Sequence, residues 1–395
     1  MARSCPTSPA PARWWRPGRT TESADSADAQ RRRHPDSIDP CKENLMNGFK
    51  RIVGAALAAL LSLCATAALA DTVVLTGYPG IFQENYTKAV VEPFRKANPD
   101  IQVEFHASPN SAQMLGTLRA QAGAPQIDIV IMDVSVAKAA TAEGLLVPID
   151  ETVTRHLGDL YPQARVEGVN AVGVTFDNLV LLHNTDKVRP APTSWNALWD
   201  ARYARQVSIP AVPDIQGIAL TIIADKMAGG TSHVQTVDAG IARLAKLAPN
   251  VQTWDPRPDV YQPIASGTAA IGIGWNARAQ VYADLSAGKL GVVLPQEGSV
   301  FQINVLGLVH RGPAGKSARK FIDYALSAPA QAAFAEQMFY APTNTRAVPL
   351  ISKAALQRTA AGAMDRMMAI DWLEVARMRA AITEQWRRRV IPLSR

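Results

Sequence analysis

Apolar, strand-like runs alternate with amphipathic, helix-like segments from residue 72 onward. This strand–helix repetition with short links predicts an α/β fold, because a parallel sheet needs helical crossovers between its strands. Asn110 and Ser111 are residue types that cap helices, so one of them is expected to begin a helix. The predicted strands are 72–76, 101–107 and 127–133, and the predicted helices are 82–97, a segment running to about 122, and a segment running to 143.

A second set of elements follows the run VGVTFDNLVLLHN at 172–184, which is too long for one ordinary strand. It suits a connection between two lobes, and QINVLGLV at 302–309 is a second candidate crossing. Two lobes joined by two crossings would leave a cleft, where ligand sites often lie. Between the crossings we predict strands at 206–210, 268–275 and 291–295 and helices at 215–227 and 234–247, and from Lys316 to the C-terminus a helical chain.

The stretch MNGFKRIVGAALAALLSLCATAALADT, which begins at Met46, has the pattern of a secretory signal peptide. Lys50 and Arg51 precede an apolar core, and Ala68-Leu69-Ala70 forms a cleavage site. The apolar core is too short for a comfortable membrane span, which needs about 20 residues. We therefore expect cleavage after Ala70 and a periplasmic product. Residues 1–45, rich in Arg, Pro and Ser, are expected to be a non-native, disordered leader from a start codon placed too early.

All three cysteines precede the predicted cleavage point, so the mature chain has no disulfide framework, thiolate metal site or cysteine nucleophile. The chain has 41 basic and 34 acidic residues, of which ten and six precede Asp71, so the mature part carries about +3. This mild charge does not indicate a nucleic-acid partner. About 325 residues remain after cleavage, which is enough for two lobes with their own cores.

Catalytic motifs are lacking in the sequence. The five histidines after residue 70 are scattered, without the spacing of a zinc site. Neither a G-x-S-x-G nucleophile elbow nor a phosphate-binding loop occurs. We therefore predict that the chain is not an enzyme and has no cofactor and no metal site.

The segment AAIGIGWNARAQ at 269–280 has two interpretations. Its loose G-x-G-x-x-A, with Glu297 further on, resembles a weak dinucleotide-binding motif. Alternatively, Trp275 ends a strand as one wall of a cleft and stacks on an alkyl chain or a cation, with Asn276 and Arg278 as polar neighbours. A core tryptophan beside a surface arginine is the structural alternative.

From about Thr72 to Ala347 the chain resembles the extracellular solute-binding proteins of ABC importers, in the type II group that includes spermidine/putrescine binders. The resemblance rests on the order and spacing of DIVIMD (128–133), AEGLLVPID (142–150), TSWNALWD (193–200), GTAAIGIGWNA (267–277), LPQEGSVFQINVLGLV (294–309) and YAPTNTRA (340–347).

The resemblance implies a two-lobe periplasmic-binding-protein type II fold. Each lobe would be a mainly parallel sheet flanked by helices, with the ligand cleft between the lobes. Such a protein is a monomer that captures a small-molecule solute and delivers it to membrane ABC permease subunits. The expected lobes are 71–176 with 304–348, and 177–303 with 349–395.

The resemblance also implies candidate ligand-binding residues. By position they are Tyr78, Asp133, Ser135, Asp214, Trp275, Asn276, Arg278, Gln302, Asn304 and Tyr340. Asp133 and Asp214 have a structural alternative as helix caps.

Three positions depart from the polyamine-binding pattern. Gln302 and Asn304 replace a tryptophan and an aspartate, and Arg278 replaces an acid. An unpaired buried charge costs several kcal/mol, so fewer acids disfavour a polycation. The leading hypothesis is an amine-bearing or zwitterionic solute, such as an amino-acid derivative, opine or aminophosphonate, with an unmodified polyamine second. Ferric iron is disfavoured, because no second tyrosine adjoins Tyr340. The rival functions are an exported hydrolase or oxidoreductase, and a ligand sensor of the same fold.

Overall fold

The computed structural model of the chain describes residues 71–230, 235–368 and 370–394, all within one unit that spans Ala68–Arg395. The predicted leader (1–45) and signal peptide (46–70), with cleavage after Ala70, lie outside the described residues.

The first group of strands forms the order β2-β1-β3-β10-β5. β1 pairs in parallel with β2 and β3, whereas β10 is antiparallel to both β3 and β5. Residues 129–133 are buried on both faces, as expected for a strand inside a helix-covered sheet. The bounds are β1 (Asp71–Gly77), β2 (Ile101–Ala107), β3 (Ile129–Asp133), β5 (Val172–Asn184) and β10 (Ser299–Val309), with β4 (Leu146–Val147) beside β10.

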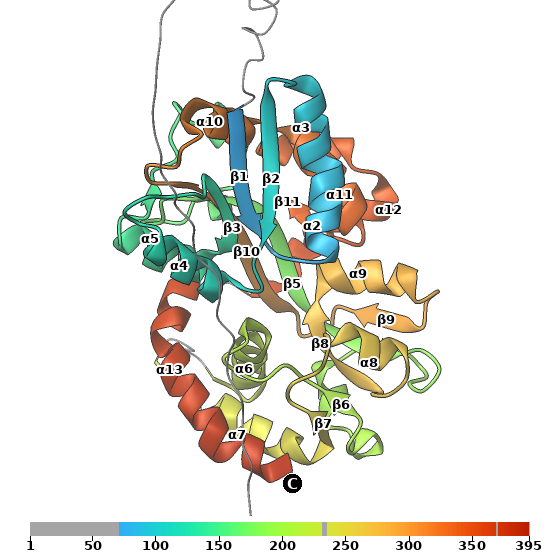
Figure 1. The fold of residues 1–395 in the computed structure, drawn as a ribbon. Helices are drawn as coiled ribbons and strands as arrows, with labels where there is room; N and C mark the ends of the chain where they lie inside the picture. The colour runs from blue at the N-terminus through green and yellow to red at the C-terminus, as the bar shows by residue number, and fades with distance from the viewer. Residues whose placement is uncertain (1–70, 231–234, 369, 395) are drawn as a thin grey trace, which may run out of the picture. The chain divides into compact units, whose positions relative to one another are not determined.

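Helices cover both sides of this sheet. In Figure 1, α4 and α5 lie on one side, and α2, α3 and α11 lie on the other. The predicted helix at 82–97 is confirmed in extent, but its middle turns, Thr87–Val91, are π-helical. The helices are α2 (Ile81–Tyr86), α3 (Glu92–Ala97), α4 (Ser111–Ala120), α5 (Val134–Ala142), α10 (Gly315–Ala325) and α11 (Ala328–Met338).

The second group of strands is joined to the first through β5. β8 and β9 pair antiparallel with the end of β5, and β6 lies parallel between β8 and β7. The strands are β6 (Val207–Ser208), β7 (Val251–Thr253), β8 (Ile271–Trp275) and β9 (Leu290–Val293), and the helices are α6 (Ile215–Met227), α7 (Asp238–Leu247), α8 (Tyr261–Ala265) and α9 (Asn276–Leu285). The predicted start of α7 at residue 234 falls on a residue outside the described ones.

The long run at 172–184 is one continuous strand, β5, in which all 13 residues are buried. Up to Asn178 it pairs with β10 on one edge and, at residues 175–176, with a short strand near residue 341 on the other, and from Leu179 onward it pairs with β8 and β9. One strand therefore belongs to both groups, which explains why its sequence is apolar for longer than a single sheet requires.

The prediction of a wholly helical chain after Lys316 is wrong. Ala341–Pro342 (β11) pairs with β5, and Met367–Met368 (β12) pairs with β10. Pro342 and Pro349 cannot continue a helix with full hydrogen bonding, so the chain between α11 and the last helix is irregular. It contains the short α12 (Lys353–Leu356) and ends with α13 (Trp372–Arg389).

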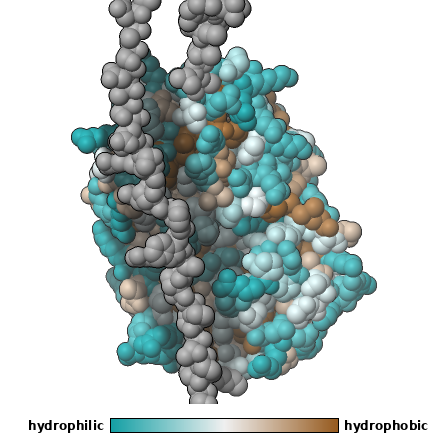
Figure 2. Space-filling view, in the orientation of Figure 1, coloured by the Kyte–Doolittle hydropathy of each residue, from teal (hydrophilic) through white to brown (hydrophobic). Residues whose placement is uncertain are grey.

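The largest side chains lie in the interior. Trp195, Trp386, Phe94 and Phe321 are fully buried. Figure 2 shows one face of the molecule, on which hydrophilic side chains predominate and apolar ones form small, separate patches. Across the described residues, every helix falls short of the length and apolarity that a membrane crossing requires.

Candidate ligand-binding site

A cavity of about 540 Å³ lies where the ends of β1, β3 and β8 meet the middle of β10. Carboxyl ends of parallel strands are common ligand positions, because the chain leaves the sheet there and the next helix begins. Eight of the ten predicted residues line this one cavity, so the geometry brings together segments that are far apart in sequence. They are Tyr78, Asp133, Asp214, Trp275, Arg278, Gln302, Asn304 and Tyr340.

A hydrogen-bond network fixes one wall of the cavity. The hydroxyl of Tyr78 donates to Oδ1 of Asn304 at 3.1 Å and lies 2.9 Å from Oγ of Ser111. The same Oγ accepts the backbone N–H of Asp133 at 3.0 Å. Nδ2 of Asn304 donates to Oγ1 of Thr175 at 3.0 Å. Burial strongly raises the pKa of Tyr78, so its phenol stays protonated and can donate.

Asp133 is the last residue of β3 and the N-cap of α5. Its Oδ1 accepts the N–H of Ser135 at 2.9 Å and also the hydroxyl of Ser135. The alternative that Asp133 caps a helix is therefore confirmed. Its second oxygen, Oδ2, is buried and has no hydrogen-bond partner. A buried carboxylate oxygen without a donor is costly, so the site favours a ligand that brings one.

Asp214 caps α6 through its Oδ1, which accepts the N–H of Gln216 at 2.7 Å. Burial raises the pKa of Asp214, while its hydrogen bonding with Gln216 and then the charges of Arg379 and Arg278 oppose that rise. The residue is nevertheless exposed at the cavity, so water weakens both effects. Asp214 is thus a cap and a cavity-lining acid at once.

Trp275 and Arg278 form the opposite wall. Trp275 ends β8 and is 8% exposed. Its backbone N–H donates to the hydroxyl oxygen of Tyr261 at 3.1 Å. In the described part of the chain, no carboxylate lies within ion-pairing distance of Arg278. Burial opposes the charge of Arg278, but nearby phenol oxygens, first that of Tyr340, leave its pKa raised.

Gln302 and Tyr340 complete the predicted lining. Gln302 is 6% exposed on β10 and pairs in register with Asp177 of β5. Tyr340 is buried and stacks on Phe334, with ring centroids 5.5 Å apart. Both side chains line the same cavity as Tyr78 and Arg278.

Ser135 and Asn276 do not line the cavity. Ser135 holds the cap on Asp133, as described above. Asn276 donates to the carbonyl of Arg358 at 2.7 Å and accepts from Gln280 at 3.0 Å. Each lies one or two residues beyond a lining residue, in the first turn of a helix, where the backbone turns its side chain away.

Several lining residues were missed in the sequence. Ser111 was considered only as a helix cap, and Asn110 is the actual cap of α4, accepting from Gln113 at 2.9 Å. Asp255 lines the cavity and is paired with Arg257 at 2.9 Å. Arg379, on α13, also lines the cavity. Its position could be predicted from the sequence, because this arginine interrupts an apolar stripe of the helix.

The structure does not support the dinucleotide interpretation. Gly272 and Gly274 lie inside β8, where a Cβ would meet the carbonyl oxygen of Ser208 and the ring of Tyr261. The glycines thus allow close packing, not phosphate binding. The carboxylate of Glu297 accepts from the hydroxyl and N–H groups of the 194–195 segment. Within the described residues there is no group of three or more His, Asp or Glu side chains that could hold a metal.

Comparisons with known proteins find similar sequences and similar folds. The model of the family described as bacterial extracellular solute-binding protein matches residues 89–362. The chain is 25% identical over 206 residues to the gamma-aminobutyric acid-binding protein of Pseudomonas aeruginosa, covering 49% of this chain and 56% of that protein. It is 24% identical over 241 residues to the spermidine/putrescine-binding periplasmic protein of Salmonella typhimurium, covering 57% and 66%.

The chain thus spans between about half and two thirds of the length of these relatives. Among solved structures, a receptor for gamma-aminobutyric acid (GABA) superposes with a TM-score of 0.68 at 24% identity, covering 80% of this chain and 96% of that one. This likeness shows a shared two-lobe fold.

Proposed function

The chain belongs to the family of bacterial extracellular solute-binding proteins, and from this premise we propose that it captures a small amine-bearing or zwitterionic solute for an ABC importer. It binds the solute in the cavity described above and delivers it unchanged to membrane permease subunits. It acts as a monomer without enzymatic activity, in the periplasm, after cleavage of a signal peptide behind Ala70.

One observation carries this proposal: the cavity has an acceptor without a donor on one wall and a cation without an anion on the other. Oδ2 of Asp133 lacks a partner, and Arg278 lacks an ion pair among the described residues. An ammonium group would satisfy Asp133, and a carboxylate or phosphonate would engage the guanidinium fork of Arg278. Trp275, on the same wall as Arg278, offers an apolar face to the carbon chain.

The balance of charge around the cavity favours a zwitterion over a polyamine. Asp255 is already paired with Arg257. The remaining lining charges are two acids, Asp133 and Asp214, and two cations, Arg278 and Arg379. A polycation would need an excess of acids, because each desolvated charge must find its partner. The names of the relatives are consistent with both classes, since one binds GABA and another binds spermidine or putrescine.

Solute capture would involve movement of the two strand groups about the strand that they share, β5. We take the moving parts to be 71–176 with 304–348, and 177–303 with 349–395. Residues of both parts line the cavity, so a solute that contacts Asp133 and Arg278 together stabilises the closed arrangement.

Isothermal titration calorimetry with GABA, 2-aminoethylphosphonate, putrescine and spermidine tests the proposal. We expect stoichiometric binding that is tighter for a zwitterion than for either polyamine, and recovery of the solute unchanged by NMR. Binding should also raise the melting temperature as the solute concentration rises, by mass action. Turnover of the solute, or absence of heat with all four compounds, would contradict the proposal.

Trp275→Ala is expected to weaken zwitterion binding by about 1–3 kcal/mol, because an aromatic anchor is lost from the cavity wall. The same titration measures this loss. Trp199→Ala is the matched control, since Trp199 packs under Arg243 and does not line the cavity. Equal affinities of wild type and Trp275→Ala would show that the indole serves only the core.

A further inference from the structure

One face of the C-terminal helix α13 is apolar except at a single position. Trp372, Val375, Ile382 and Trp386 are between 0% and 4% exposed. Their spacings of three, seven and four residues place them on one side of the helix. Arg379 lies in the same stripe, seven residues from each tryptophan, which is about two helical turns. An arginine at an inward position of such a stripe needs a polar environment, and here that environment is the cavity.

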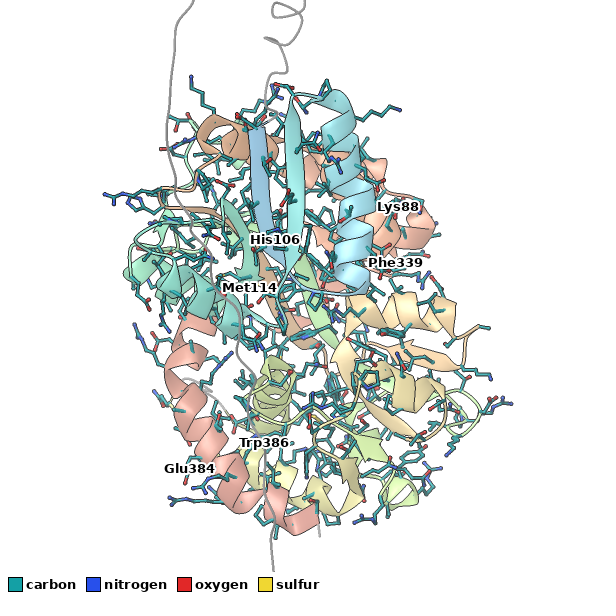
Figure 3. The ribbon with its side chains drawn as sticks, viewed as in Figure 1. Lys88, His106, Met114, Phe339, Glu384 and Trp386 are labelled. Carbon is teal, nitrogen blue, oxygen red and sulfur yellow. The ribbon has the colours of Figure 1, made fainter. Side chains whose placement is uncertain are left out.

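Both ends of α13 are anchored. The indole N–H of Trp372 donates to the carbonyl of Phe301 on β10, and that of Trp386 donates to Oγ1 of Thr221 on α6 at 2.8 Å. Figure 3 shows Trp386 on the side of α13 that faces α6. Trp386 also packs edge-on against Trp254, with centroids 5.3 Å apart. These anchors fix the rotation of the helix about its axis and so hold Arg379 toward the cavity.

The other arginines of α13 are engaged in ion pairs. Arg377 pairs with Glu374, Arg387 and Arg388 pair with Glu384, and Arg389 pairs with Asp238 on α7. Arg379 has no ion pair with any described residue, although it is only partly exposed. Asp214, whose pKa is raised by burial and partly lowered again by the charge of Arg379, already uses one oxygen to cap α6. The guanidinium of Arg379 is therefore available to an anion in the cavity.

We infer that Arg379 binds the anionic group of the solute and, together with Arg278, determines specificity for solutes that carry one. This inference rests on the proposed function, because it assigns a residue to the same cavity. Arg379 comes from a helix that lies beyond the segment 89–362 matched by the family model. The C-terminal helix is thus part of the binding site, and a bound anion would tie α13 to the cavity.

Affinities of Arg379→Gln for GABA and for putrescine, measured by calorimetry, test the inference. We expect the variant to lose GABA affinity by about tenfold or more, the strength of a hydrogen-bonded charge contact. Putrescine has no anionic group, so its affinity should stay the same or rise. Arg379→Lys, which keeps the charge but not the fork, should fall between wild type and Arg379→Gln. Arg377→Gln, on the same helix but away from the cavity, is the matched control and should change neither affinity.

The selectivity ratio between GABA and putrescine separates a binding role from a structural one. Damage to α13 packing would lower both affinities together, and an unchanged GABA affinity would show that the guanidinium does not reach the solute. Either result overturns the inference but leaves the proposed function standing. If the wild type binds neither GABA nor 2-aminoethylphosphonate, both the inference and the zwitterion assignment fail.

Discussion

Arg278→Ala is expected to weaken binding of GABA or 2-aminoethylphosphonate by about 2–5 kcal/mol, as does removal of one partner of a buried charge pair. The guanidinium lines the cavity, is largely surrounded by aromatic side chains, and makes no ion pair with the described residues. A carboxylate that loses Arg278 would keep only Arg379, on α13, as its cationic partner among the lining residues, so most of its desolvation cost would no longer be offset. Calorimetry with each solute measures the loss.

The same substitution should affect putrescine in the opposite direction. Arg278 repels an ammonium group, so its removal leaves less positive charge in the cavity to compete with putrescine for Asp133 and Asp214. The affinity for putrescine should therefore rise. Arg202→Ala is a suitable control, because Arg202 is exposed, paired with Asp200 at 2.6 Å, and remote from the lining residues. Equal losses for GABA and putrescine would contradict the zwitterion assignment.

The strand ends of the site were predictable, and the reason is geometric. Asp133 and Trp275 each close a buried apolar run, so the sequence places them where a strand leaves its sheet. The alternatives weighed for Asp133, cap or ligand residue, turn out to be compatible, since one oxygen caps α5 while the other has no partner. Sequence alone does not separate two oxygens of one carboxylate.

Side-chain direction and C-terminal structure were harder to predict. Ser135 and Asn276 adjoin lining residues, but the first turn of each helix directs them elsewhere. The short strands β11 and β12 exist only because β5 and β10 offer partners far away in sequence. Arg379 is different: the stripe from Trp372 to Trp386 marks it as an inward-facing arginine from sequence alone.

A buried acid in the shared strand β5 is expected to make the stability of the protein depend on pH. Asp177 lies on β5 just before the strand changes partners, and it is 1% exposed. Its Oδ1 accepts the N–H of Asn178 at 2.8 Å and that of Ala277, in the first turn of α9, at 3.1 Å. Its Oδ2 is buried without a partner. Burial raises the pKa of Asp177 from 3.8 to about 7, against the two N–H donors and the charge of Arg278.

This raised pKa makes the folded state bind a proton that the unfolded state releases. Between about pH 4 and pH 7 the free energy of unfolding should therefore fall as pH rises, because ionising Asp177 is unfavourable only in the folded protein. The stabilisation that protonated Asp177 gives the folded protein is fully present below the pKa of the unfolded chain. It is lost once the pH passes about 7. A shift of this size corresponds to at most roughly 4 kcal/mol.

Asp177→Asn should remove this pH dependence. The amide oxygen can accept both N–H groups, and the neutral side chain resembles protonated Asp177 in shape and charge. We expect unfolding free energies close to wild type near pH 4 and higher than wild type, by up to a few kcal/mol, at pH 8. Urea unfolding at pH 4, 6 and 8 measures the difference.

Asp186→Asn, at an exposed position on the surface, controls for the loss of one negative charge and should leave the pH profile of stability unchanged. The difference in stability between Asp177→Asn and wild type at pH 8 is expected to be positive. If Asp177→Asn is less stable than wild type at pH 8, then the ionised carboxylate is stabilising in the folded protein. In that case the charge of Arg278 and the two N–H donors outweigh the cost of burial, and Arg278 is not fully available to a solute anion. The pH profile of one buried acid therefore also tests whether the guanidinium across the strand is free.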